Sequence, residues 1–241
     1  MFALRTEGLS RRFGKLAAVT GLSLEVQPGD IYGFLGLNGA GKTTSIRMLL
    51  SLIRPDSGSI YFYDKELRSN YIEIMSGVGG MVDIPVFYPH LSGRDNLRLM
   101  ARLRNCYKEE IITEALASTG LLERGTDKVR TYSQGMRQRL GIANALLPIF
   151  INQRSSCSIK PVIILDEPTN GLDPKGIIDI RRMIKRLNLD NQATFIISTH
   201  MLAEVEKLCN RVGIIQEGKL AAQGTLVEVL NDKKSLEEYF I

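Results

Sequence analysis

Residues 36–43 read Gly-Leu-Asn-Gly-Ala-Gly-Lys-Thr, which has the G-x-x-x-x-G-K-[ST] spacing of a phosphate-binding loop. Three glycines are expected to turn the backbone through positive φ and to bring its N–H groups close to phosphate oxygens: Gly36, Gly39 and Gly41. Lys42 should place a positive charge at the β- and γ-phosphates, and the Thr43 hydroxyl should bind Mg²⁺. The other positions expected to contact the nucleotide are Asn38, Ala40 and Thr44.

The residues on either side of this loop have the composition that the motif requires. Residues 31–35 form a short apolar run suited to a buried strand, and residues 45–53 are typical of a helix with apolar side chains at helical spacing. The N-terminus of that helix would add a partial positive charge at the phosphates. The stretch therefore predicts a nucleotide-binding site at a strand, loop and helix.

A second segment supplies carboxylates for the metal and for water. Residues 162–165 are wholly apolar, as in a central parallel strand, and they are followed by Asp166 and Glu167. Asp166 is the expected partner of Mg²⁺, usually through water, and Glu167 can polarise the attacking water as a general base.

Three further motifs follow the same order and spacing as in a known family. They are Tyr-Ser-Gln-Gly-Met-Arg-Gln-Arg-Leu at 132–140, Pro-Thr-Asn-Gly-Leu-Asp-Pro at 168–174 and Ile-Ser-Thr-His at 197–200. With the loop and the acidic pair, they make the chain resemble the ATPase subunits of ATP-binding-cassette (ABC) transporters over nearly its whole length. The resemblance implies ATP and Mg²⁺ as cofactors, a nucleotide-contacting loop that includes Asp173, and a His200 ring near the γ-phosphate and Glu167. His200 is one of only two histidines in the chain, and a zinc site is not expected there.

Ser133, Gln134 and Gly135 stand just before an apolar-periodic helix at residues 136–147. A hydroxyl, backbone N–H groups and the helix dipole could all face an anion there, although Ser133 alone would also suit an ordinary helix N-cap. The resemblance implies that the anion is the γ-phosphate of a second ATPase subunit, so that two chains, identical or different, enclose two nucleotides.

Two positions depend on the resemblance for their interpretation. Phe13 falls where the family stacks an aromatic ring on adenine, but an aromatic residue beside a strand can equally belong to the core. Asp83 stands where most relatives carry a Gln that senses Mg²⁺, and a carboxylate can still accept hydrogen bonds from metal-bound water. The segment at 132–140 is similar to the family signature, but it has Gln134 where Gly is usual and Met136 where Gln is usual. Asp83 and this altered signature resemble those of ATPases of bacterial exporters that confer bacitracin or lantibiotic self-protection.

The composition bounds the class of protein. The chain has 241 residues, 44% hydrophobic content and a net charge of +5, enough for one domain with a real core. No run approaches the ~20 apolar residues of a membrane span, and no export signal is evident. An odd number of cysteines argues against a disulfide framework, and no basic tract indicates nucleic acid. We expect a cytoplasmic location, peripheral on the inner face of the membrane through a membrane subunit.

The motifs predict an α/β fold: a P-loop NTPase core with a mixed sheet, an N-terminal antiparallel β edge and an inserted helical lobe. Residues 1–82 and 161–220 should form the nucleotide-binding core, residues 84–160 the helical lobe and residues 221–241 a helical tail of a single 1–241 domain. Residues 148–160 exceed a short connection, and the simplest interpretation is an exposed insertion without an assigned role.

An aromatic-rich segment follows Asp83 directly. We expect Phe87, Tyr88 and Leu91 to line a groove for a short helix of a membrane subunit, and the alternative is that they pack inside the lobe. Two functions remain. The first is the motor subunit of a membrane exporter, which the narrower resemblance links to an antimicrobial peptide or other drug-like substrate. The second is a non-transport ABC ATPase acting on the ribosome or nucleic acid. The signature disfavours a generic P-loop kinase.

Overall fold

The computed structural model describes residues 1–83, 85–105, 107–154, 160–230 and 236–239. The strands are β1 (Leu4–Phe13), β2 (Leu16–Leu22), β3 (Glu25–Val26), β4 (Ile31–Leu35), β5 (Ser57–Phe62), β6 (Lys65–Glu66), β7 (Val78–Met81), β8 (Val162–Asp166), β9 (Thr194–Thr199), β10 (Arg211–Gln216) and β11 (Lys219–Thr225). The helices are α1 (Lys42–Leu49), α2 (Tyr71–Gly77), α3 (Gly93–Leu103), α4 (Glu109–Ser118), α5 (Gln134–Asn152), α6 (Pro174–Asn191), α7 (Leu202–Leu208) and α8 (Leu226–Leu230), with 3-10 turns at Val129–Thr131 and Leu236–Tyr239.

The strands form two sheets. The larger sheet has the order β11-β10-β4-β9-β8-β7, in which β11 pairs antiparallel and the other neighbours pair parallel. The smaller sheet is antiparallel, has the order β2-β1-β5-β6 and pairs β3 with β1. This arrangement confirms the predicted α/β fold with a mixed sheet and an N-terminal antiparallel edge.

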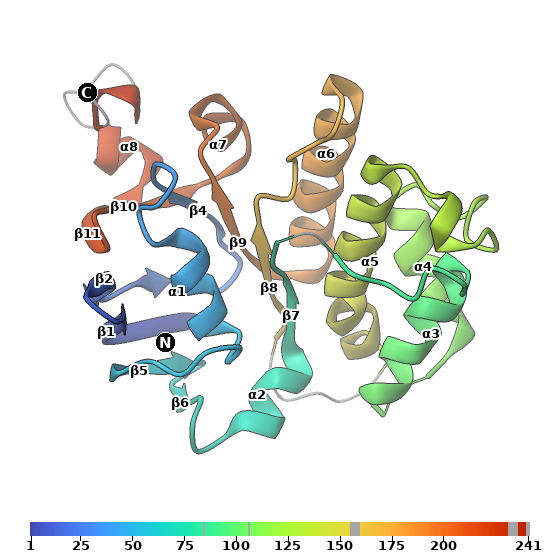
Figure 1. Cartoon of the computed structure of the whole chain (residues 1–241), viewed down its shortest axis with the longest axis horizontal. Coiled ribbons are helices and arrows are strands. Elements are labelled where there is room, and N and C mark those ends of the chain that lie inside the picture. Colours follow the sequence, from blue (N-terminus) through green and yellow to red (C-terminus); the bar gives the residue numbers. More distant parts are fainter. Residues whose placement is uncertain (84, 106, 155–159, 231–235, 240–241) are drawn as a thin grey trace.

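Alternating side chains give the larger sheet two buried faces. In β8, Val162 and Ile164 belong to a core shared with α1 and the antiparallel sheet. Ile163 and Leu165 belong to a second core shared with α5, α6 and α7. Because both faces are covered, the strand is apolar at every position before its terminal carboxylate. Figure 1 shows α3, α4 and α5 together at the end of the molecule opposite β1, β2 and β5.

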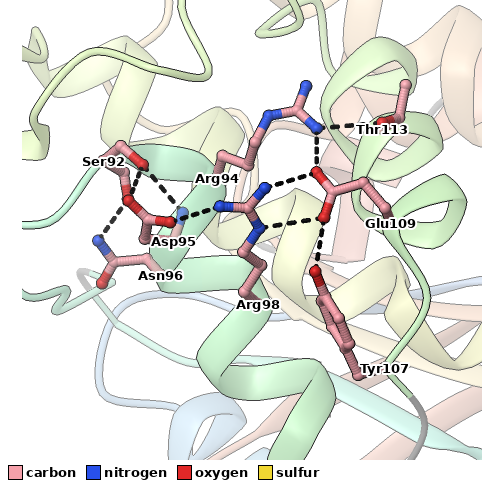
Figure 2. A network of polar contacts seen from close by, with 8 residues as sticks. All are labelled: Ser92, Arg94, Asp95, Asn96, Arg98, Tyr107, Glu109 and Thr113. Atoms are coloured by element: carbon pink, nitrogen blue, oxygen red, sulfur yellow. Dashed lines mark hydrogen bonds and ion pairs between the residues drawn. The ribbon is translucent and has the colours of Figure 1, made fainter.

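A polar network joins α3 to α4 within this helical region (Figure 2). Ser92 caps α3 by accepting a hydrogen bond from the Asp95 backbone N–H. The Arg98 guanidinium binds Glu109 through two hydrogen bonds of 3.0 and 2.9 Å, and Arg94 binds the same carboxylate at 2.6 Å. Tyr107 donates a further hydrogen bond of 2.8 Å to Glu109. Glu109 is therefore the centre of the network.

We expect the contribution of Glu109 to stability to depend on pH. The hydrogen bonds from Arg98 above all lower the pKa of Glu109 to about 2, from the 4.5 of a free glutamate. A depressed pKa means that the stabilisation is complete above pH 4.5 and is lost as the pH falls towards 2. Because the groups are partly exposed, Glu109→Gln should cost only about 1 kcal/mol at neutral pH. Thermal unfolding of the unchanged chain and of Glu109→Gln, at several pH values from neutral to acidic, measures this difference in stability.

The neighbouring Glu110 provides the control, since it is exposed on the same first turn of α4. Glu110→Gln should leave the melting temperature nearly unchanged at neutral pH. An equal loss in both variants would show that helix charge, and not the network, accounts for the effect.

Helix α5 corrects the prediction of an exposed insertion at residues 148–160. The helix continues through Pro148 to Asn152, and Ile149, Phe150 and Ile151 are buried in the core. Proline usually ends a helix because it lacks an N–H and crowds the preceding turn. Here the apolar residues after Pro148 bury enough surface to continue the helix. Residues 155–159 lie outside the described residues.

The C-terminal segment begins differently from the predicted helical tail at residue 221. Strand β11 continues to Thr225 because it pairs antiparallel with β10 over its whole length, and the helical part starts with α8 at Leu226. Here Glu228 accepts a 2.7 Å hydrogen bond from the Thr225 backbone N–H at the start of α8. The residues at 231–235 and 240–241 lie outside the described residues.

Candidate nucleotide-binding and catalytic site

The phosphate-binding loop connects the end of β4 to the start of α1, as the sequence predicts. Gly39 and Gly41 have φ values of 83° and 104°, so both require the left-handed backbone that glycine allows. Gly36 differs from the expectation, because it does not have a positive φ. A Cβ there would stand 2.6 Å from the Ile215 carbonyl oxygen, so Gly36 is required for close approach of the chain.

Lys42 begins α1 and is buried against the loop that precedes it. Its Nζ donates hydrogen bonds to the carbonyl oxygens of Gly36 at 2.7 Å and Leu37 at 3.2 Å. The same Nζ lies 3.8 Å from Glu167 Oε1. The ammonium is thus held above the loop and faces the carboxylate at the end of β8. Asn38 and Gly39 are exposed on the loop, Ala40 is buried and Thr44 is partly buried on α1.

Thr43 and Asp166 meet at the edge of the larger sheet. Thr43 Oγ1 donates a 2.9 Å hydrogen bond to Asp166 Oδ2, and Ser198 Oγ donates to the other carboxylate oxygen. A hydroxyl and a carboxylate are hard oxygen donors, which are the ligands that Mg²⁺ prefers. Among the described residues no group of three or more His, Cys, Asp and Glu could hold a metal. Thr43 and Asp166 are therefore the residues that would hold a bound Mg²⁺.

Glu167 occupies a turn that several elements hold. Its φ is 48°, a conformation uncommon for residues other than glycine and concentrated at functional sites. The Glu167 backbone N–H donates to Ser198 Oγ at 3.1 Å, and His200 Nδ1 lies 3.0 Å from each carboxylate oxygen. The structure thus brings together Lys42, Glu167 and His200, which the sequence placed in three separate motifs.

Two residues that support this turn were not predicted. Ser198 binds both acidic residues because it pairs with Asp166 in the register of β8 and β9. Gln138 Nε2 donates to the carbonyl oxygens of Glu167 at 3.3 Å and Pro168 at 3.2 Å. Gln138 is a buried polar residue on α5, and the sequence carries no signal for its partner.

The signature residues lie at the N-terminus of α5, away from the phosphate-binding loop of the same chain (Figure 1). Ser133 caps α5 by accepting a hydrogen bond of 3.2 Å from the Met136 backbone N–H. Ser133 and Gln134 are exposed and Gly135 is partly exposed. Asp173 caps α6 in the same way, with Oδ1 accepting from the Gly176 N–H at 3.0 Å. The N-cap interpretation of Ser133 is thus confirmed, and the exposed turn remains open to a partner.

Phe13 ends β1 and is 46% exposed, so the alternative of a core residue is wrong. The Arg11 guanidinium lies 5.0 Å from the centre of the Phe13 ring. This exposed ring fits an aromatic platform for a base, and stacking on adenine remains a prediction.

We expect Phe13→Ala to weaken ATP binding by about 1–3 kcal/mol, the usual value of one base stacked on an aromatic side chain. Phe13→Tyr should restore the affinity because it restores the ring. Equilibrium binding of a fluorescent ATP analogue measures both. If Phe13→Ala binds as tightly as the unchanged chain, the ring does not stack on adenine.

Asp83 and the aromatic segment occupy the region between β7 and α3. Asp83 has a φ of 55° and forms an ion pair with Arg47 of α1. Phe87 is partly buried against the lobe core, Leu91 is partly buried, and Tyr88 is 50% exposed. The Tyr88 backbone is fixed by Asn96, whose side chain accepts from its N–H at 2.9 Å and donates to its carbonyl oxygen at 3.1 Å. Packing inside the lobe thus accounts for Phe87, and Tyr88 presents exposed surface.

The geometry agrees with a comparison of the sequence with protein families. The family described as ABC transporter matches residues 19–170, which include the phosphate-binding loop, the signature and the acidic pair. The chain belongs to the ABC transporter family. As a member, it binds and hydrolyses ATP. ABC transporter ATPases of this kind work as dimers with membrane subunits.

Relatives of this ABC ATPase have transport names. It is 45% identical to a bacitracin transport ATP-binding protein, BcrA, of Bacillus licheniformis over 90% of this chain and 68% of that protein. It is 33% identical to a lantibiotic transport ATP-binding protein, SrtF, of Streptococcus pyogenes over 98% of this chain and 95% of that protein. The solved structure of an ATP-binding subunit of an ABC transporter has a TM-score of 0.84 and 26% identity, and the alignment covers 99% of this chain and 98% of that chain.

Proposed function

We propose that this ABC ATPase powers a membrane exporter for an antimicrobial peptide or another drug-like substrate. The observation that carries the proposal is the 45% identity to a bacitracin transport protein over 90% of the chain. The alternative, a non-transport ATPase acting on the ribosome or nucleic acid, gains no support from BcrA and SrtF, which are both named for transport. In the proposed division, residues 1–82 and 161–220 are the nucleotide-binding core and residues 84–160 are the helical lobe.

In the proposed site, the loop amides and Lys42 would bind the phosphates, and Thr43 and Asp166 would hold Mg²⁺. A bound Mg²⁺ would neutralise phosphate charge and orient the terminal phosphoryl group. Glu167 accepts a proton from the attacking water as the general base. His200, at 3.0 Å from Glu167, orients this carboxylate and contacts the γ-phosphate. Asp83 would accept hydrogen bonds from water bound to the metal.

The site is completed by a second ATPase subunit, identical or different. Ser133, Gln134 and Gly135 would face the nucleotide held by the partner, because the exposed N-terminus of α5 offers N–H groups and a partial positive charge. Asp173 lies in the neighbouring turn before α6 and would contact the same interface.

The membrane association is proposed to be indirect. Among the described residues, no helix is long and apolar enough to cross a bilayer. We propose a peripheral position on the inner face of the membrane, with a short helix of the membrane subunit contacting Phe87, Tyr88 and Leu91. Tyr88 is the strongest candidate for direct contact because it is half exposed on a backbone that Asn96 fixes.

Loss of the Tyr88 side chain tests this docking surface and the transport function together. We expect Tyr88→Ala to reduce the fraction of the chain that is recovered with host membranes by about 5–30-fold, as for loss of 1–2 kcal/mol of interface energy. Leu189→Ala is the control, because Leu189 is exposed on α6. Equal membrane recovery of all three chains would contradict docking through Tyr88. Recovery with ribosomes or nucleic acid instead would favour the alternative function.

A further inference from the structure

Helix α1 reaches the edge of the larger sheet through two side chains on one face. Thr43 and Arg47 stand one helical turn apart, so both point to the same side of the helix. Thr43 binds Asp166 at the end of β8, and Arg47 binds Asp83 just beyond the end of β7. The two contacts are parallel links between the helix that follows the phosphate-binding loop and two neighbouring strands.

Asp83 and Glu167 follow the ends of two neighbouring strands. Met81 pairs with Leu165, so β7 and β8 end at the same edge of the larger sheet, with Asp83 two residues beyond β7 and Glu167 one residue beyond β8. Three carboxylates therefore share this edge: Asp83, Asp166 and Glu167. Like charges repel, and each needs a donor or a cation nearby. Asp166 receives hydroxyl groups and Glu167 lies 3.8 Å from the Lys42 ammonium, whereas Asp83 is paired with the Arg47 guanidinium.

We propose that Arg47 is a positioning residue that holds the Asp83 carboxylate and competes for it with Mg²⁺. This proposal rests on the proposed role of Asp83 in the hydration shell of the metal. The Arg47 side chain extends from α1 and its guanidinium donates to an Asp83 carboxylate oxygen. A carboxylate that is bound in this way is less available to accept hydrogen bonds from metal-bound water. Arg47 thus compensates the negative charge that a carboxylate at position 83 adds to this edge of the sheet.

The pair also connects the proposed docking segment to the phosphate-binding loop. Residues 85–91 begin two positions after Asp83 in the sequence, and Arg47 lies one helical turn beyond Thr43 on α1. A partner that moves the segment would change how Asp83 is shared between Arg47 and the metal.

The test is a double-mutant cycle with Arg47→Gln, Asp83→Asn and both substitutions, in a binding assay without hydrolysis. Mg²⁺ is titrated against each chain with a fixed concentration of a fluorescent, non-hydrolysable ATP analogue. Arg47→Gln should lower the Mg²⁺ concentration at half-saturation by about two- to five-fold, the range of an exposed ion pair, because Asp83 becomes available. In the Asp83→Asn background the same substitution should have no effect.

Two controls separate this role from a general loss of charge. Arg47→Lys keeps a cation and should stay close to the unchanged chain. Arg54→Gln removes the same charge from an exposed position beyond the end of α1, and should not shift the Mg²⁺ dependence. The proposal would be overturned if Arg47→Gln shifted the Mg²⁺ titration equally in the unchanged chain and in Asp83→Asn. It would also be overturned if Arg47→Gln shifted the titration in neither.

The interaction energy of the Arg47–Asp83 pair is also measured without nucleotide, by thermal unfolding of the unchanged chain, the two single variants and the double variant. If the stability losses of the two single variants do not add up to that of the double variant, the ion pair is supported. If they add up, the ion pair is overturned. Failure of the unchanged chain to bind the analogue would contradict the proposed nucleotide site instead, and the unfolding cycle would then decide on the pair alone.

Discussion

Glu167→Gln should lower steady-state ATP turnover by about 10²–10⁴-fold, the usual cost of removing a general base. The amide has nearly the shape of the carboxylate, so the turn held by Ser198 and Gln138 should persist. A neutral amide cannot accept the proton of the attacking water. Substrate binding should therefore remain, and ATP should accumulate in the site. Turnover is measured from phosphate release, and assembly from light scattering after size-exclusion chromatography with ATP and Mg²⁺.

We expect the Glu167→Gln chain to form an ATP-dependent dimer, because nucleotides that are not hydrolysed keep both halves together. Glu206→Gln serves as the matched control, since Glu206 is exposed on α7, and it should hydrolyse ATP at the normal rate. Normal turnover of Glu167→Gln would show that another group activates water. If the chain stays monomeric with ATP, a different ATPase or the membrane subunit must complete the site.

Lys42→Ala should weaken ATP binding itself, by about 1.5–3 kcal/mol or roughly 10–150-fold in the dissociation constant, as for loss of a hydrogen bond to a charged group. The ammonium is buried, held by the Gly36 and Leu37 carbonyl oxygens, and therefore preorganised for phosphate. Its loss also leaves those oxygens without this donor. Equilibrium binding of a fluorescent ATP analogue measures the change.

Lys219 offers a lysine control near the same loop. It lines a pocket of about 780 Å³ that also borders residues 37–40, and it is exposed. Lys219→Ala removes the same formal charge, so it should change affinity much less than Lys42→Ala if position and burial matter. Equal losses would indicate that only the general positive potential at the loop attracts nucleotide.

The sequence predicted those site residues that belong to short sequence motifs. The phosphate-binding motif and the acidic pair predicted Lys42, Thr43, Asp166 and Glu167 as one site, and the resemblance to ABC ATPases added His200. The sequence could not predict Ser198, which depends on the register of β8 and β9, or Gln138, which reaches a turn far along the chain. Arg47 was missed for the same reason.

Two sequence-based expectations fail because tertiary packing overrides a local rule. Pro148 predicts the start of an exposed insertion, but the three apolar residues after it are buried as a continuation of α5. The motif predicts a positive φ at Gly36, whereas the small size of this residue is what the Ile215 carbonyl oxygen requires. Local propensity sets a preference, and burial of neighbouring side chains decides the outcome.

The hydrogen bonds from Gln138 to the Glu167 and Pro168 carbonyl oxygens have a consequence for a dimer. Gln138 stands on the same helix as the signature, one turn after the residues that would face the partner's nucleotide. Helix α5 would thus hold the turn of the general base Glu167 in its own chain and contact the nucleotide bound by the other chain. In the proposed dimer, hydrolysis of the nucleotide that contacts the N-terminus of α5 would shift this helix. The shift would disturb the Glu167 turn that Gln138 holds in the same chain. Hydrolysis at one ATP site would then change the rate at the other, so the two sites would be coupled and not independent.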